Sequence, residues 1–208
     1  MRISELSVKS GVALPTVKYY LREGLLHQGV QTAATRAEYD ESHLRRLRLI
    51  RALLEVGRLP VAAIKQVIEA VEDDSLPIHK MLGTAHYALG PTVEPEPGED
   101  WRLAREEVDR LVADLGWDIH PAAPTRDELA QTLVRMRQLG LHIDLKPYVE
   151  ATTKLVSEFE MGLVPFQGPR DAAVEALVLG TVLYGKVFDT LRRMAQESES
   201  ARRLRPHP

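Results

Sequence analysis

Residues 1–26 have the sequence MRISELSVKSGVALPTVKYYLREGLL and predict two short helices joined by a tight turn. Gly11 lies where two crossing helices need a residue that is free to take a positive φ angle. After this turn, Leu14, Val17 and Leu21 fall on one side of the second helix at about 100° per residue and form an apolar stripe. The stretch therefore predicts a helix-turn-helix unit whose second helix has one buried side.

The other side of that second helix carries the side chains that a DNA major groove accepts. Thr16, Tyr19 and Arg22 lie opposite the apolar stripe, and Lys18 and Tyr20 lie on its flanks. Hydroxyl, phenol, ammonium and guanidinium groups can all hydrogen-bond to base edges or phosphates. For Tyr20, a half-buried packing role explains the position equally well. We interpret this segment as a candidate recognition helix.

Two motifs extend the pattern: I-x-E-L-x-x-x-x-G-V-x-x-x-T-V-K-Y-Y-x-R-E-G-L-L over residues 3–26, and R-x-E-Y-D-E-x-H-L-R-R-L-R-L-I over residues 36–50. In this order they resemble the DNA-binding domain of the MerR family of bacterial transcription regulators, from residue 2 to about residue 71. The resemblance implies a winged helix-turn-helix in which residues 27–39 form the wing. It also implies that Thr16, Lys18, Tyr19, Tyr20 and Arg22 contact bases and phosphates, and that Arg36 and Tyr39 of the wing touch the DNA backbone.

Two further helices are predicted after the wing, over residues 41–57 and 60–72. Asp40 is the expected N-cap of the first, with Gly57 just past its end, and Pro60 suits the first turn of the second. The apolar residues that repeat at helical spacing are Leu44, Leu47, Ile50, Leu54, Ile64, Val67, Ile68 and Val71. The arginines interleaved with them, Arg45, Arg46, Arg48 and Arg51, are most simply explained as a solvated helix face.

The remainder of the chain predicts helices, without an alternating strand pattern after the wing. A helix is expected over residues 77–89, and another from an Asp100 cap to Gly116. A Thr125-x-x-Glu128 capping box predicts a third helix, with Leu129, Leu133, Met136 and Leu139 on its inner face, and a fourth follows Asp144. The segment from Pro169 to about Gln196 is the most apolar, so we expect it to be buried. A homodimer interface is the favoured explanation for its burial, and a purely internal core helix is the alternative.

The predicted fold is mainly α, with a winged helix-turn-helix DNA-binding domain followed by an all-α dimerisation and effector domain. The expected division assigns residues 1–72 to the DNA-binding domain, 73–99 to a short helix and a proline-rich linker, 100–198 to the all-α domain, and 199–208 to a flexible basic tail. Charge follows this division. Residues 1–71 hold eleven Lys and Arg against seven Asp and Glu, a net charge of +4, whereas residues 72–208 carry −7. A basic DNA-reading domain joined to an acidic domain fits this asymmetry.

Composition excludes several classes of function. The chain has no cysteine, which rules out disulfides, thiol redox sensing and thiolate metal sites. No signal peptide opens it, and the uncharged run over residues 176–185 is well short of the roughly 18 to 20 residues that span a bilayer. We therefore expect no membrane contact and a cytoplasmic, nucleoid-associated location.

No metal, cofactor or catalytic site is expected. His79 and His86 lie seven residues apart, which puts them on one helix face but about 10 Å apart along the axis, too far for one ion. No phosphate loop, nucleophile elbow or His-Glu zinc motif is present, so we do not expect an enzyme. An organic effector could bind between helices of the C-terminal domain. Its aromatic lining would come from Trp101, Trp117, Tyr148, Phe159, Tyr184 and Phe188, although simple core filling explains each residue taken alone.

The sequence thus predicts a homodimeric, sequence-specific regulator that binds double-stranded promoter or operator DNA. RNA polymerase and a small organic effector are its candidate partners, and activation and repression are both open. One alternative is an architectural or recombination-accessory DNA-binding protein without a ligand. A second is a ligand-handling helical protein or enzyme whose N-terminal unit docks a partner protein.

Overall fold

The computed structural model describes residues 1–33, 36–91, 93–95 and 98–205 and divides the chain into two compact units. Unit 1 comprises Met1–Ala85 and Leu163–Pro208, and unit 2 comprises His86–Gly162. The C-terminal segment therefore groups with the N-terminal residues, whereas the division expected from the sequence joined it to residues 100–162. Of the predicted linker and tail, Thr92, Glu96, Pro97 and residues 206–208 lie outside the described residues.

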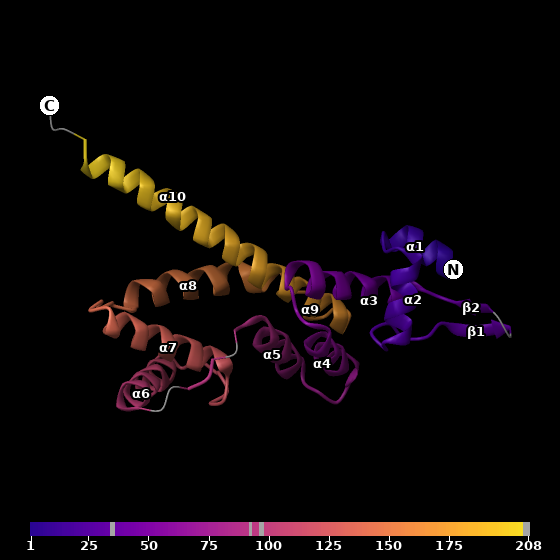
Figure 1. Ribbon diagram of the computed structural model, residues 1–208, viewed down its shortest axis with the longest axis horizontal. Coiled ribbons are helices and arrows are strands. Elements are labelled where there is room, and N and C mark those ends of the chain that lie inside the picture. Colours follow the sequence, from indigo (N-terminus) through magenta and orange to yellow (C-terminus); the bar gives the residue numbers. More distant parts are fainter. Residues whose placement is uncertain (34–35, 92, 96–97, 206–208) are drawn as a thin grey trace. The chain divides into compact units, whose positions relative to one another are not determined.

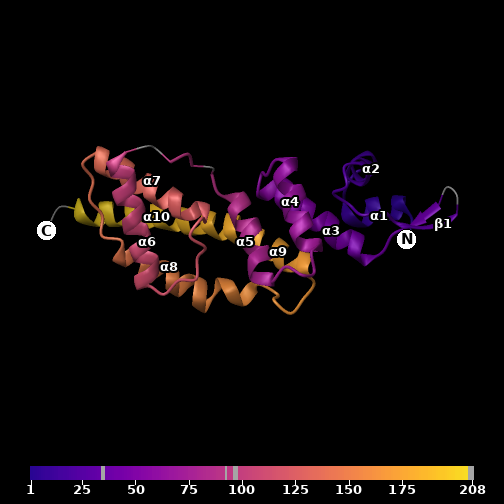
Figure 2. The same cartoon turned by 90° about the horizontal axis from the view of Figure 1, so that it is seen from below.

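Unit 1 begins with helices α1 (Ile3–Ser10) and α2 (Leu14–Arg22), followed by a two-stranded antiparallel hairpin of β1 (Val30–Ala33) and β2 (Arg36–Glu38) (Figure 1). Val30 pairs with Glu38, and the register shifts between Gln31 and Ala33. In both views the hairpin extends away from α1 and α2 (Figures 1 and 2). The predicted order of two helices and a wing is therefore confirmed.

Glycines follow both of the first two helices, and the predicted turn at Gly11 is confirmed. Gly11 caps α1 with a φ angle of +68°, and its N–H donates to the carbonyl of Val8. Gly24 follows α2 with a φ angle of +73°. Residues with a Cβ rarely adopt this left-handed conformation, so these glycines set the angles at which the chain enters and leaves α2.

After the hairpin come α3 (Glu41–Arg51), the π-helical turn η1 (Ala52–Val56) and α4 (Val61–Glu72). Asp40 is the N-cap of α3, because its carboxylate accepts the Ser42 N–H at 2.9 Å. All of the apolar residues predicted to line these helices are buried except Leu54, which is half-buried: Leu44, Leu47, Ile50, Ile64, Val67, Ile68 and Val71.

The C-terminal helix α9 (Arg170–Leu179) packs against α3, η1 and α4 in the core of unit 1. Figure 2 shows it beside α3 and α4. Its buried residues are Ala173, Val174, Leu177 and Val178. Ion pairs join α3 to α9, at 3.5 Å between Arg45 and Asp171 and at 3.8 Å between Arg48 and Glu175.

The arginines of α3 therefore do not form a purely solvated face: Arg48 and Arg51 are exposed as predicted, whereas the prediction is wrong for the buried Arg46. Arg46 is buried and pairs with Glu72 at 2.7 Å, and Arg51 pairs with Glu55 at 3.0 Å. Helical spacing predicts the direction in which a side chain points. It does not predict which acidic residue from elsewhere in the chain packs opposite that side chain.

A second π-helical turn, η3 (Gly180–Tyr184), and helix α10 (Gly185–Arg203) continue α9 without a break. Figure 1 shows α10 extending beyond the other helices of unit 1. None of its residues is buried within the single chain, so burial inside the chain is confirmed for α9 and does not extend to α10, while burial of α10 at a homodimer interface stays a prediction. The helix also continues past Gln196 to Arg203, into the residues predicted as a tail.

Unit 2 contains α6 (Glu99–Asp114), α7 (Pro124–Gln138) and α8 (Lys146–Glu158), and the 3₁₀ turn η2 (Glu160–Leu163) follows. Helix α5 (Ile78–Leu89) spans the boundary between the two units. Helices α6 and α7 pack side by side, as both views show (Figures 1 and 2). Their shared core consists of Ala104, Val108, Ala130, Leu133 and Val134.

The start and inner face of α7 differ from the prediction. The N-cap is Ala123 and Pro124 opens the helix, so Thr125 lies inside the first turn and cannot act as the cap of a capping box. The fixed φ angle of proline favours this earlier start. The inner face shifts with it, and Ala130 and Val134 are buried while Leu139 is exposed. Among the described residues no helix is both long and apolar enough to cross a membrane.

Candidate nucleic-acid interface

Helix α2 separates its two sides as a recognition helix does. Val17 is fully buried, whereas Lys18 and Arg22 are exposed, and Thr16 and Tyr19 are half-exposed. The Arg22 side chain keeps 74% of its surface accessible. The exposed side therefore offers two cations, a phenol and a hydroxyl, which can reach phosphates and base edges together.

Tyr19 and Arg22 lie together on this surface. The guanidinium carbon of Arg22 is 5.4 Å from the centroid of the Tyr19 ring, within the range of a cation–π contact. Glu23 lies 3.8 Å from Arg22 but also 3.5 Å from Lys65 of α4, so its charge is shared between two cations. Arg22 is thus oriented by the ring while its charge stays available to an anion.

Tyr20 lies on a flank of α2, with its ring 5.8 Å from that of Tyr19, and its side chain points into the protein. Its exposed fraction is 7%, and the N–H groups of Leu25 and Leu26 donate to its carbonyl as the chain leaves the helix. Burial, and then the nearby Glu55 carboxylate, raise the pKa of its phenol, so the ring is neutral at physiological pH. The structure therefore gives Tyr20 the packing position that was one of its two interpretations.

The two wing residues singled out from the sequence also differ in how far they are exposed. Arg36 is exposed on β2, whereas Tyr39 is 8% exposed. The backbone of Tyr39 pairs with that of Met1, whose ammonium donates to the Tyr39 carbonyl at 2.7 Å. A Cβ on Gly29 would come within 2.7 Å of the Glu38 carbonyl oxygen and 3.1 Å of the Tyr39 ring, so glycine is required there. Tyr39 thus fixes the base of the wing to the N-terminus, and Thr35 of the wing lies outside the described residues.

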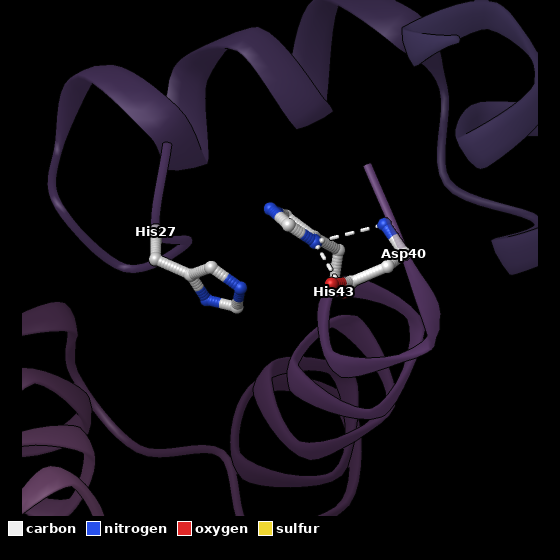
Figure 3. Close-up of side chains that lie close together, drawn as sticks. All are labelled: His27, Asp40 and His43. Carbon is white, nitrogen blue, oxygen red and sulfur yellow. Dashed lines mark hydrogen bonds and ion pairs between the residues drawn. The ribbon is translucent and has the colours of Figure 1, made fainter. Parts of the chain in front are cut away.

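His27, Asp40 and His43 form a cluster at the same base of the wing (Figure 3). A hydrogen bond from the Ser42 hydroxyl holds the pKa of the Asp40 carboxyl well below its usual range. Burial and the neighbouring His43 lower the pKa of His27. This cluster was not identified from the sequence, because the hairpin separates His27 from the other two. The available signal was Asp40-x-x-His43, a spacing that puts both side chains on the first turn of α3.

The six aromatic residues proposed as an effector lining do not come from one unit. Trp101 packs against the α6–α7 core, and Trp117, Tyr148 and Phe159 are exposed in unit 2. Tyr184 and Phe188 belong to unit 1, at η3 and α10. Unit 2 therefore contains four of the six.

These features define a winged helix-turn-helix DNA-binding protein. Helix α2 has the position of the second helix in such a unit, and the β1–β2 hairpin that follows has the position of the wing.

Comparison with known proteins gives the family. Residues 1–71 match the model of the MerR HTH family regulatory protein. Over the whole of both chains, the structure is similar to the crystal structure titled "the putative transcriptional regulator SCO5550 from Streptomyces coelicolor A3(2)", with 38% sequence identity and a TM-score of 0.77. A search among curated proteins finds no match. The chain belongs to the MerR family of helix-turn-helix regulatory proteins, and both similarities point to a DNA-binding regulator rather than an enzyme.

Proposed function

We propose that the protein is a homodimeric, sequence-specific transcription regulator that binds a two-fold symmetric promoter or operator site. The observation that carries this proposal is the exposed side of α2, where Tyr19 and Arg22 are in contact and Lys18 is free of the core. A helix of this composition can enter the major groove, where each base pair presents a distinct pattern of hydrogen-bonding groups.

Within this proposal the candidate contact residues divide into two groups. Thr16, Lys18, Tyr19 and Arg22 face the DNA bases and phosphates, and Arg36 contacts the backbone from the wing. Tyr20 and Tyr39 act from inside unit 1, because side chains that are more than nine-tenths buried can support a reading surface but offer little area to a duplex. Their role is to hold α2 and the wing at a fixed angle.

The proposed dimer interface is α10. Leu183 of the preceding turn η3 and Val187, Leu191 and Met194 of α10 lie four, four and three residues apart, which puts them on one face over about 17 Å of continuous helix. Each is about half exposed, and a continuous apolar stripe of this kind is typical of a helix that pairs with another. A second copy of the chain fits best, because two DNA-reading units on one rigid interface match a palindromic site.

The route from α10 to α2 lies entirely within unit 1. Helix α9 is held on α3 by two ion pairs and continues into η3 and α10. Helix α3 contacts α1, which packs on α2. Pairing through α10 would therefore set the separation of the two recognition helices, and hence the half-site spacing that the dimer accepts.

Genome-wide footprinting of the bound sites tests the proposal. We expect protected regions that lie in promoters, share an inverted repeat and keep one half-site spacing. An architectural or recombination-accessory protein would instead protect DNA without a common sequence, because phosphate contacts carry no sequence information. A protein-docking N-terminal unit would give no protection even at low salt, where electrostatic binding to DNA is strongest.

For effector binding we assign unit 2, which contains both tryptophans of the chain, Trp101 and Trp117. Apolar side chains exposed there, including Tyr148 and Phe159, suit an organic molecule better than an ion. A change of tryptophan fluorescence on adding hydrophobic compounds supports this assignment, and an unchanged spectrum across a broad set of compounds contradicts it. RNA polymerase is the proposed partner at the promoter, and transcription in vitro from a footprinted promoter distinguishes activation from repression.

A further inference from the structure

The histidine cluster at the base of the wing contains more polar groups than helix capping requires. Asp40 and His43 together cap α3, since the Asp40 carboxylate accepts from Ser42 and the Asp40 N–H donates to Nδ1 of His43 at 3.1 Å. His27 takes no part in this capping. Even so, its ring lies against that of His43 at a tilt of 39° with centroids 3.9 Å apart, and its Nε2 atom lies 2.9 Å from the Ser42 hydroxyl. Helix capping therefore does not account for the position of the His27 ring beside His43 and Ser42.

The three side chains bring metal-binding atoms to one point. One ligand atom from each of His27, Asp40 and His43 lies within 4.8 Å of the other two, and Asp40 Oδ1 is 2.9 Å from His43 Nδ1 (Figure 3). Ligand atoms of a tetrahedral zinc ion lie about 3.4 Å apart, given bonds of roughly 2.0 to 2.2 Å. The three atoms, now up to 4.8 Å apart, would reach that separation through rotation of their side chains.

The chemistry of the donors also fits. His43 is 3% exposed, and its Nδ1 accepts a hydrogen bond from the Asp40 N–H, so this nitrogen is unprotonated and an ion bound there would take the place of that hydrogen bond. The Asp40 carboxylate supplies a negative charge. Nearby Arg46 is paired with Glu72 at 2.7 Å, so its charge is offset. Two imidazoles with one carboxylate favour a divalent transition metal over calcium or magnesium.

The Ser42 hydroxyl now lies where the ion would be bound. Its Oγ atom is 2.9 Å from His27 Nε2, 2.5 Å from Asp40 Oδ1 and 3.5 Å from His43 Nδ1. A rotation about the Ser42 side-chain bond would move it out of the centre of the three donor atoms. The backbone N–H of Ser42 would still donate to the Asp40 carboxylate, so α3 would keep this half of its cap.

We propose that His27, Asp40 and His43 form a binding site for a divalent transition-metal ion such as zinc, with water as the fourth ligand. The site joins His27, which precedes β1, to the N-terminus of α3, which follows β2. A bound ion would therefore tie together both ends of the wing. It would stabilise unit 1 and restrict the angles that the wing can take over a DNA backbone.

Metal titration of the full-length, untagged chain, stripped of metal with a chelator, tests the site. Calorimetry with Zn²⁺ should show one ion per chain, and Co²⁺ should give the visible d–d absorption of a tetrahedral nitrogen and oxygen site. His27→Gln and Asp40→Asn should each weaken Zn²⁺ binding at least about tenfold and remove the Co²⁺ bands. Asparagine keeps a good N-cap, so the second variant should stay folded.

His79→Gln is the matched control, since His79 is exposed on α5 outside the cluster. It should bind zinc as the wild type does. The proposal is overturned if the wild-type chain binds no zinc, or if its zinc affinity is unchanged in both His27→Gln and Asp40→Asn. These readouts use no DNA, so their outcome is independent of the proposed function.

Discussion

Arg170 donates a hydrogen bond from Nε to the carbonyl of Val71 at 2.9 Å, across ninety-nine residues of sequence. Its other guanidinium nitrogens donate to the carbonyls of Ala70, Asp73 and Leu76 at 2.9 to 3.0 Å. The last carbonyls of a helix lack intrahelical partners, and here one side chain from α9 satisfies those at the end of α4. This contact holds the C-terminal helix on the DNA-reading unit.

The first prediction concerns this contact. Arg170→Ala should lower the free energy of unfolding by about 3 kcal/mol, because several carbonyls at the end of α4 lose a charged donor together. Urea denaturation of both chains measures the change. Arg193→Ala is the control, since Arg193 is exposed on α10 and its pair with Asp189 is a surface pair. Equal stability of Arg170→Ala and wild type would show that the contact contributes nothing.

The second prediction concerns the reading surface. Tyr19→Ala and Arg22→Ala should each weaken binding to the footprinted duplex by about 1 to 3 kcal/mol, with little effect on folding, because each removes one side chain that reaches the DNA. Gel-shift titration measures the affinity, and circular dichroism checks the fold. Arg102→Ala, an exposed arginine in unit 2, is the control and should bind as wild type. Wild-type affinity in both α2 variants would remove α2 from the interface.

The third prediction separates Tyr20 from Tyr19. Because Tyr20 is buried, Tyr20→Ala should destabilise unit 1 by about 3 to 5 kcal/mol, as large-to-small changes of core aromatic residues do. Tyr20→Phe keeps the ring and should leave DNA affinity near wild type. A strong loss of affinity in Tyr20→Phe, with the fold intact, would instead assign the hydroxyl to DNA contact.

The fourth prediction concerns the dimer. Leu191→Glu puts a charge in the apolar stripe of α10 and should convert the dimer to a monomer at concentrations where wild type is dimeric, which sedimentation velocity measures. Gln196→Glu adds the same charge on the opposite face of α10 and should remain dimeric. Identical sedimentation of wild type and Leu191→Glu would exclude α10 as the interface.

The fifth prediction is a dependence of stability on pH. Burial raises the pKa of Glu175, and Arg48 offsets only part of that rise. A carboxyl group with a higher pKa in the folded chain binds its proton more tightly there, so the free energy of unfolding falls as pH rises above the unfolded value of 4.5. Glu175→Gln should therefore be more stable than wild type at pH 7 and equal to it well below pH 4.5.

Glu55→Gln provides the opposite sign. A hydrogen bond from Arg51 lowers the pKa of Glu55, so its ionised form stabilises the folded chain above the unfolded pKa and this contribution disappears on acidification. The variant should be less stable than wild type at pH 7. Thermal melts at both pH values compare the three chains, and the same sign for the two variants would contradict the assignment.

Local signals account for the parts of the fold that the sequence predicted. Gly11 and Gly24 are needed for positive φ angles, Asp40 has the side chain of an N-cap, and the apolar repeats of α3 and α4 fall on one face. Each of these depends on neighbours within a few residues. The order of elements in the winged helix-turn-helix could therefore be predicted without knowledge of long-range contacts.

Long-range contacts account for what the sequence did not predict. Tyr20 lies on a flank of α2, and whether a flank is buried depends on what packs against it. The pairing of Arg45 with Asp171 joins residues more than a hundred positions apart, so the sequence could not show that α9 belongs to unit 1. His27 reaches His43 only because the hairpin returns the chain to its starting point.

The most direct test of sequence-specific reading by α2 is a pair of affinities. Wild-type protein is titrated with the footprinted duplex and with a scrambled duplex of the same composition, at physiological salt. We predict that the footprinted duplex binds at least about 10³-fold more tightly, the lower end of the range for specific protein–DNA complexes. Equal affinity for the two duplexes would contradict the account.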